Sequence, residues 1–357
     1  MMTDGDAELY RGWGGELVAS CYDEGTGAFM FICVHSTVRG PAAGGIRLKA
    51  YDSPGDGLRD GMRLSRAMSL KMAICGAPLG GGKAVIALDS ARGDVSTGQR
   101  GPLLERFAAL LASLKGTYYG APDMNTGPAD MDFIHARSPY VFCRTEERGG
   151  SGSTTQHTAL GVFCSILASA EFAFGSRSLA GKSVVVQGVG EVGAALVGRL
   201  VRAGARVTIS DVAEDRVAKL AAEFGVASVA PEAAAATDCD IFAPCATGGV
   251  LNARSIPELR CAVVAGAANN QLATPEDDAR LHERGILYAP DFVASAGGVL
   301  HGVGLELWRW SEAQVDRAVE QLGDTLLEVF AKARAERIGT HAAAEKLARA
   351  KLAVPRA

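Results

Sequence analysis

A glycine-rich turn at residues 188–193 is the strongest chemical signal in this 357-residue sequence. Gly188-Val189-Gly190-Glu191-Val192-Gly193 follows the β-branched run 182–186 and precedes a helical pattern that ends at Gly204. In such a strand–turn–helix unit, the first glycine permits a sharp turn, the second lets the backbone approach a pyrophosphate, and the third allows close helix–strand packing. The N–H groups at the start of the helix then face the phosphates. The turn therefore predicts a dinucleotide-binding site.

An acidic residue selects between the two common dinucleotides. Asp211 ends the next expected strand, 206–210, about twenty residues after the turn. A carboxylate at this place accepts hydrogen bonds from the adenosine ribose hydroxyls and repels a 2′-phosphate. The sequence therefore predicts NAD as the cofactor, in preference to NADP.

A second glycine cluster, Gly80-Gly81-Gly82, comes directly before Lys83. A phosphate-binding P-loop would need a glycine at position 77 and a serine or threonine at position 84, and both positions hold alanine. The alternative is a lysine held on a compact glycine turn, where desolvation and a neighbouring cation such as Lys71 lower its pKa toward the range of a general base. Two solvated surface lysines remain the simpler reading of the same pattern.

The composition is that of an ordinary globular protein and excludes several classes. Hydrophobic residues make up 48% and charged residues 21%, and the net charge of −4 supplies no attraction for nucleic acid or for an anionic membrane. Eight cysteines without a C-x-x-C pair indicate free thiols and a cytoplasmic protein. We expect neither a signal peptide nor a membrane span, and the six histidines show no ligand spacing, so no metal site is expected.

Periodic segments alternate along the chain and predict an α/β fold with two domains. Strands are expected at 28–35, 83–88, 182–186, 206–210, 240–243 and 262–265, and helices at 57–75, 103–115, 233–236, 312–336 and 341–351. The polar, glycine-rich stretch 147–153 predicts a boundary. We therefore expect an N-terminal α/β substrate domain over residues 1–148 and a doubly wound Rossmann NAD-binding domain over 149–324. Helices within 325–357 are expected to pack back across the cleft onto the first domain.

Six further segments, in the family's order, resemble the glutamate/leucine/phenylalanine/valine dehydrogenase family of amino acid dehydrogenases. Within that family, the stretches 122–126 and 147–152 look most like phenylalanine dehydrogenases of actinobacterial type. The six segments are Gly40-Pro41-Ala42-Ala43-Gly44-Gly45-Ile46-Arg47, Leu70-Lys71-Met72-Ala73, Gly80-Gly81-Gly82-Lys83, Ala121-Pro122-Asp123-Met124-Asn125-Thr126, Gly266-Ala267-Ala268-Asn269-Asn270 and Tyr288-Ala289-Pro290-Asp291-Phe292.

This resemblance implies a reaction: NAD-dependent oxidative deamination of an L-amino acid, with L-phenylalanine expected, to the 2-oxo acid, ammonia and NADH, and its reverse. Lys83 would be the general base and Asp123 would exchange protons with the amino group. Lys71, with the backbone at Gly44 and Gly45, would bind the α-carboxylate. The remaining implied contacts are Asn269 and Asn270 to the amino group and the nicotinamide side, Thr154 and Thr158 to the carboxamide, and Cys245 and Ala246 to the cofactor. A homo-oligomer formed through the first domain is also implied.

Two positions depart from the family pattern. Ser295 stands where asparagine is usual, and serine cannot span two partners as an amide does. Ile46 stands where threonine is usual and is expected to reshape the substrate side of the cleft.

Three rival functions remain open. They are the same reaction on leucine or valine, a 2-hydroxy acid dehydrogenase, and an NAD-binding regulator without turnover. The lysine pair and the lack of a well-placed histidine base argue against the hydroxy acid. Apolar neighbourhoods around the motifs favour a large apolar substrate over glutamate, whose second carboxylate would need a cation. These neighbourhoods are at Met72, Ala73, Met124, Val293, Leu300 and Val303.

Overall fold

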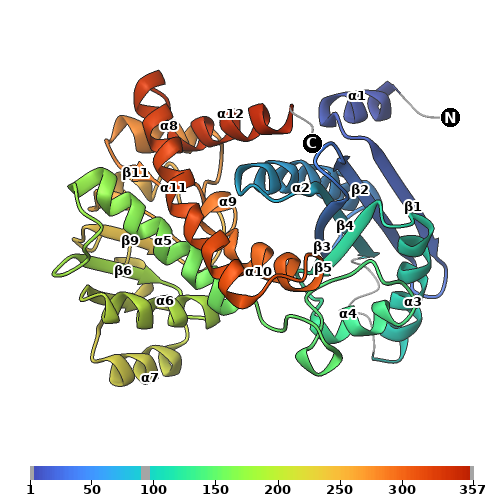
Figure 1. Ribbon diagram of the computed structural model, residues 1–357, viewed down its shortest axis with the longest axis horizontal. Helices are drawn as coiled ribbons and strands as arrows, with labels where there is room; N and C mark the ends of the chain where they lie inside the picture. The colour runs from blue at the N-terminus through green and yellow to red at the C-terminus, as the bar shows by residue number, and fades with distance from the viewer. Residues whose placement is uncertain (1–3, 90–96, 354–357) are drawn as a thin grey trace. The chain divides into compact units, whose positions relative to one another are not determined.

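The computed structural model describes residues 4–89 and 97–353, and its chain divides into two compact units (Figure 1). The first unit comprises Met1–Ser153, Leu305–Arg309 and Ala348–Ala357, and the second comprises Thr154–Gly304 and Trp310–Leu347. The first crossing of the chain between units thus lies after Ser153, close to the expected boundary at 148. The C-terminal segment returns to the first unit at residue 348 instead of 325, because helix α11 (Glu312–Glu336) packs along α5 (Thr155–Phe174) within the second unit.

A mixed five-stranded sheet forms the centre of the first unit, in the order β1-β2-β4-β3-β5. Its strands are β1 (Leu17–Asp23), β2 (Ala28–Ser36), β3 (Ala42–Tyr51), β4 (Gly80–Asp89) and β5 (Tyr118–Pro122). Strand β4 pairs antiparallel with β2 and parallel with β3, which is itself parallel to β5. The helices of this unit are α1 (Asp4–Trp13), α2 (Pro54–Ile74), α3 (Thr97–Ser113) and α4 (Pro128–His135).

Alternation along the strands assigns each side chain of this sheet to one of two cores. Val85 of β4 packs with Met62 of α2 in one cluster, whereas Ile86 packs with Phe107 of α3 in the other. Lys83 is two residues from Val85 and therefore lies on the α2 face of the sheet. The two-residue period of a strand thus decides which helix a site residue meets.

Six parallel strands form the sheet of the second unit, in the order β11-β10-β9-β6-β7-β8. They are β6 (Ser183–Gln187), β7 (Arg206–Ser210), β8 (Ala227–Ser228), β9 (Ile241–Pro244), β10 (Val263–Val264) and β11 (Leu287–Tyr288). Read outward from β6 on each side, this is the 3-2-1-4-5-6 order of a doubly wound dinucleotide-binding fold. The predicted fold class is confirmed, and the topological switch point falls between β6 and β9.

The second unit contains helices that the sequence predicted, after the glycine turn and near the C-terminal end, and others that it did not, including α5. Besides α5 and α11 they are α6 (Glu191–Arg202), α7 (Glu214–Phe224), α8 (Glu276–Glu283), α9 (Asp291–Ala294), α10 (Gly297–Glu306) and α12 (Thr340–Leu352), of which α10 and α12 end in the first unit. Helix α11 begins at the expected capping box, where the N–H of Ser311 donates to Oε1 of Gln314 at 2.9 Å. The expected helix at 233–236 is wrong: a 3₁₀ turn, Pro231–Ala233, is followed by hydrogen-bonded turns. One turn of alanines is too short to repay the cost of helix nucleation.

Helix α5 is an exception to the expectation that no segment could span a membrane. Its length and hydropathy are sufficient for a span, and half of its most apolar window is buried in the protein. It packs against α11 and α6, as a core helix of the second unit does (Figure 1).

Candidate active site

Strand β4 carries Lys83 into the interior on the α2 face, where its side chain is 7% exposed. The expected glycine turn before it is wrong, because Gly80–Gly82 belong to the strand itself. A Cβ on Gly81 would lie 2.0 Å from the backbone nitrogen of Ser69 in α2, and one on Gly82 would lie 2.6 Å from the ring of Tyr118. These glycines let helix α2 and the ring of Tyr118 approach the strand closely.

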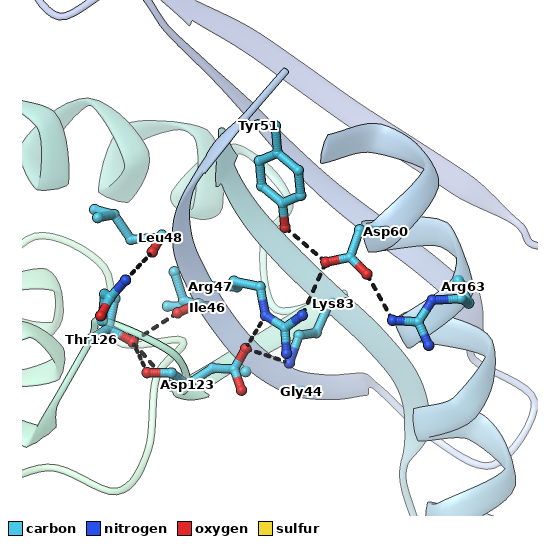
Figure 2. A network of polar contacts seen from close by, with 12 residues as sticks. Gly44, Ile46, Arg47, Leu48, Tyr51, Asp60, Arg63, Lys83, Asp123 and Thr126 are labelled. Atoms are coloured by element: carbon cyan, nitrogen blue, oxygen red, sulfur yellow. Dashed lines mark hydrogen bonds and ion pairs between the residues drawn. The ribbon is translucent and has the colours of Figure 1, made fainter. Parts of the chain in front are cut away.

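The ammonium of Lys83 meets one carboxylate directly. Its Nζ lies 2.9 Å from Oδ2 of Asp123, which follows β5 (Figure 2). The hydroxyl of Thr126 accepts from the N–H of Asp123 at 2.9 Å and donates to the carbonyl of Ile46 at 2.7 Å. A Cβ on Gly45 would lie 2.6 Å from Cβ of Asp123 and 3.0 Å from Nζ of Lys83. Gly45 is thus needed for the Lys83–Asp123 approach, which brings two of the expected site residues into direct contact.

Figure 2 also shows a guanidinium that the sequence reasoning did not assign. Arg47 on β3 donates from Nε to Oδ2 of Asp123 at 2.8 Å and from a terminal nitrogen to Oδ2 of Asp60 at 3.0 Å. Asp60 on α2 also accepts from the hydroxyl of Tyr51 at 2.7 Å and from Arg63 at 2.8 Å. Arg47 therefore links the carboxylate of Asp123 to the carboxylate of Asp60 on α2.

Burial and charge act in opposite directions on the two catalytic candidates. Burial lowers the pKa of Lys83 below its ordinary value, although the carboxylate of Asp123 opposes this effect. Burial alone would raise the pKa of Asp123, but Lys83 and Arg47 outweigh it and the pKa is lowered. Asp123 is therefore ionised at neutral pH, and Lys83 is a cation whose proton is easier to remove than that of a surface lysine.

Other residues of the first unit lie as follows. Lys71 is half-buried in the last turn of α2. A Cβ on Gly44 would lie 1.9 Å from the carbonyl oxygen of Gly82, so this glycine is required by strand packing. Ile46 was expected to reshape the substrate side of the cleft, and it does not reach such a surface. It is fully buried in the cluster on the α3 face, because the two-residue period of β3 places it on the face opposite to Gly45 and Arg47.

The turn after β6 has the geometry expected of a dinucleotide site. Gly188 has φ +93°, and a Cβ on Gly193 would lie 2.0 Å from the carbonyl oxygen of Gly188. A Cβ on Gly190 would meet only the guanidinium of Arg216, at 4.0 Å, and a hollow of about 500 Å³ lies beside it. Gly190 is the N-cap of α6 and supplies no side-chain cap. The open space and the uncapped helix start fit a pyrophosphate.

Asp211 also supports the turn. Its Oδ2 accepts from the N–H of Val189 at 2.8 Å, and its Oδ1 accepts from the N–H of Ala213 at 2.9 Å. Burial would raise its pKa, but these N–H groups and Arg216, 3.4 Å away, lower it. The carboxylate is therefore ionised, as ribose recognition requires, and it carries a cation beside it that the sequence prediction did not consider.

The other expected cofactor contacts lie around the carboxyl ends of the strands. Cys245 and Ala246 follow β9, and a Cβ on Gly188 would lie 2.7 Å from the backbone nitrogen of Ala246. A Cβ on Gly298, at the start of α10, would lie 2.4 Å from the hydroxyl of Thr158 and 3.2 Å from that of Thr154. The structure thus brings these two threonines together at Gly298.

Asn269 and Asn270 are exposed after β10, and the buried hydroxyl of Ser295 is 3.5 Å from Oδ1 of Asn269. Ser295 therefore lies beside Asn269, where it can donate a long hydrogen bond to the amide oxygen. Although Ser295 replaces the asparagine that is usual in the family, the side-chain amide of Asn269 still contacts the segment before α10.

A dinucleotide fold in one unit and a buried Lys–Asp pair in the other define a two-domain oxidoreductase. Comparison with known proteins narrows this class. Residues 22–139 match the model of the Glu/Leu/Phe/Val dehydrogenase dimerisation domain, and residues 209–354 match that of glutamate/leucine/phenylalanine/valine dehydrogenase. The chain belongs to this family, its members are oxidoreductases, and its cofactor is NAD.

Curated relatives and solved structures agree with the family assignment over nearly the whole chain. A leucine dehydrogenase of Geobacillus stearothermophilus is 40% identical over 93% of this chain and 89% of its own length. A valine dehydrogenase of Streptomyces virginiae is 42% identical over 94% of this chain and 93% of its own length. The crystal structure of L-tryptophan dehydrogenase from Nostoc punctiforme has a TM-score of 0.85 and 34% identity, and covers 97% of this chain and 98% of its own.

Proposed function

We propose that the protein oxidises an apolar L-amino acid to its 2-oxo acid and ammonia, using NAD, with L-phenylalanine as the preferred substrate. The observation that carries the proposal is the buried contact between Lys83 and Asp123, held in place by Arg47. A regulator without turnover would have no need to keep a lysine buried against a carboxylate, because the desolvation of such a pair is costly.

Both catalytic residues transfer protons in the proposed reaction. NAD held at the Gly188–Gly193 turn would supply the hydride acceptor, so that loss of a hydride from the substrate Cα would leave an imine. Lys83, in its neutral form, takes a proton from the water that adds to the imino carbon. Asp123 takes a proton from the amino group and returns it to the nitrogen of the carbinolamine. Lys83, once it has released its first proton to solvent, accepts the hydroxyl proton, and the carbinolamine collapses to the 2-oxo acid as ammonia leaves. The lowered pKa of Lys83 increases the fraction of neutral amine available for this step.

Arg47 acts on the reaction through Asp123. Its guanidinium bonds both Asp123 and Asp60, so the catalytic carboxylate has one position relative to α2. We propose that Lys71, with the backbone of Gly44 and Gly45, binds the substrate α-carboxylate, and that Thr154, Thr158, Asn269 and Asn270 meet the nicotinamide and amino groups. Gly188–Gly193, Asp211, Cys245 and Ala246 form the rest of the proposed cofactor site.

The side chain of the substrate is proposed to be apolar because the residues expected near it from the sequence are apolar. They are Met72, Ala73, Met124, Val293, Leu300 and Val303. The named relatives include leucine, valine and tryptophan dehydrogenases, all of which act on apolar amino acids. The resemblance of residues 122–126 and 147–152 to phenylalanine dehydrogenases favours the aromatic substrate. A buried glutamate carboxylate without a cation would cost several kcal/mol.

We also propose a homo-oligomer in the cytoplasm. The match of residues 22–139 to a dimerisation domain supports self-association, and the eight cysteines are all free thiols.

The test is an initial-rate screen of NADH formation with L-Phe, L-Tyr, L-Trp, L-Leu, L-Val and L-Glu. We expect the highest kcat/KM with L-Phe and the lowest with L-Glu. A lead for leucine or valine would move the preferred substrate to the branched-chain amino acids, and a lead for glutamate would overturn the apolar pocket.

A further inference from the structure

Four side chains of the second unit form a polar cluster that takes no part in the proposed reaction. They are His157 in the first turn of α5, His301 in α10, and Glu312 and Asp316 in the first two turns of α11. Nε2 of His157 lies 3.2 Å from a carboxylate oxygen of Asp316 and 3.6 Å from one of Glu312. The two imidazole rings stack with centroids 4.1 Å apart.

The two histidines combine burial with unused donor atoms. His301 is 4% exposed, and Nδ1 of each ring is buried and makes no hydrogen bond within residues 4–89 and 97–353. A buried polar atom without a partner is costly, and native structures rarely keep two in contact unless another group satisfies them. Two imidazoles with two carboxylates opposite are a donor set that suits a divalent transition metal.

The charge state of the cluster also suits a cation. Burial and the neighbouring His157 lower the pKa of His301 to about 4, so its ring is neutral at physiological pH. The exposed carboxylates of Glu312 and Asp316 supply negative charge and an entry path from solvent.

We propose that His157, His301 and Glu312, assisted by Asp316, bind one divalent transition-metal ion of the zinc class. One ligand atom from each of the first three residues lies within 4.8 Å of the others. In a tetrahedral site, ligands about 2.0–2.2 Å from a shared ion lie roughly 3.3–3.6 Å apart, so donor atoms up to 4.8 Å apart need to draw in by as much as about an ångström. The rings must also turn out of their parallel stack to direct their lone pairs at the ion.

The place of the cluster in the chain suggests what the ion would hold. His157 lies three residues after the crossing at Ser153/Thr154, His301 three residues before the end of the segment at Gly304, and Glu312 two residues after the segment starting at Trp310. The ion would therefore tie together the first turns of α5 and α11 and the middle of α10, the helices along which the chain enters or leaves the second unit. Thr158 follows His157 on α5 and Thr154 is the N-cap of that helix, so occupancy would stiffen the helix start that carries both threonines.

The experiment measures metal binding itself, which is independent of the proposed activity. Purified protein without an affinity tag is stripped with a chelator and titrated with Zn²⁺ by calorimetry, and with Co²⁺ by visible absorption. We expect one ion per chain and a Co²⁺ spectrum with imidazole nitrogen ligands. His157→Gln, His301→Gln and Glu312→Gln should each weaken binding by at least the roughly 10–100-fold that loss of an outer-shell partner costs.

Matched controls are available on the same unit. His282 of α8 and Glu328 of α11 are exposed and lie outside the cluster, so His282→Gln and Glu328→Gln should bind Zn²⁺ as the unchanged protein does. Glu312 is exposed, so its variant tests the site even if the buried His301 variant fails to fold. Absence of a saturable one-to-one site, or equal affinity in the Glu312→Gln, His157→Gln and control variants, would overturn the proposal.

Discussion

The glycines beside Lys83 and those of the 188–193 turn differ in what fills the space of the missing side chain. At Gly81 and Gly82 the protein's own atoms, from Ser69 and Tyr118, lie within 2.6 Å of where a Cβ would be. At Gly190 the nearest atom is 4.0 Å away, at the end of a flexible arginine. A glycine-rich segment thus indicates a ligand where the space stays open, and close packing of the chain where it does not.

The two regions also handle charge differently. In the first, Lys83, Asp123, Arg47 and Asp60 neutralise one another in the interior, so each pKa depends on its neighbours. In the second, Asp211 is held by backbone N–H groups and by one surface arginine. Chemistry is therefore expected from the first region and ligand recognition from the second.

The largest expected effect comes from Lys83→Ala. Loss of a general base typically lowers kcat by about a hundredfold to ten-thousandfold. Steady-state kinetics at saturating substrate measure it, and Lys49→Ala, on the neighbouring strand and exposed, is the control. A Lys83→Ala enzyme with a nearly unchanged kcat would reduce Lys83 to a structural partner of Asp123.

Arg47→Met should produce the next largest effect. It leaves Asp123 and Asp60 without the shared guanidinium, at a cost of about 1–3 kcal/mol, and so a roughly tenfold to hundredfold loss of kcat/KM. Since Arg47 lowers the pKa of Asp123, its removal raises that pKa, and the acid limb of the kcat/KM profile should move to higher pH. Arg63→Met, which loses only an exposed bond to Asp60, should leave the limb in place. An unmoved limb in Arg47→Met would argue against the positioning role.

The substitutions Gly81→Ala and Gly190→Ala distinguish a glycine required by close packing from one that leaves space for a ligand. Gly81→Ala should destabilise the fold by about 1–3 kcal/mol or more, because a backbone nitrogen occupies the space, and the thermal midpoint should fall. Gly190→Ala should leave the midpoint unchanged and raise the KM for NAD about tenfold, which is about 1.4 kcal/mol. A lowered midpoint in Gly190→Ala would show that the turn, too, is closed by protein packing.

The smallest expected effect concerns cofactor choice. Asp211→Ala should narrow the preference for NAD over NADP about tenfold, or about 1.4 kcal/mol, because Arg216 is left free to meet a 2′-phosphate. The ratio of the two kcat/KM values measures this preference. Arg216→Ala in the same background should remove the gain, and a gain that persists would assign it to the loss of Asp211 alone.

Much of the fold could be predicted from local signals. The β-branched run, the glycine turn and Asp211 all lie within residues 182–211, so the dinucleotide fold follows from one supersecondary unit. The capping box at Ser311 likewise marked the start of α11 correctly. The helix predicted at 233–236 is wrong because the helix propensity of alanine does not determine how long a helix tertiary packing permits.

The catalytic network was only half visible. The family resemblance implies roles for Lys83 and Asp123 but none for Arg47. Only the parallel pairing of β3 with β4 and β5 brings Arg47 between Asp60 and Asp123. Side chains alternate between the two faces of a strand, so Gly45 and Arg47 share one face and Ile46 lies on the other. This alternation predicts Arg47 on the α2 face and Ile46 in the core. His157, His301 and Glu312 lie far apart in sequence, so no ligand spacing could reveal their cluster.

The most direct test of the division between chemistry and recognition is NADH binding, followed by fluorescence titration, to Lys83→Ala and to Gly190→Ala. We expect Lys83→Ala to bind NADH with the affinity of the unchanged enzyme, and Gly190→Ala to bind about tenfold more weakly. Loss of NADH binding in Lys83→Ala together with unchanged binding in Gly190→Ala would contradict the account.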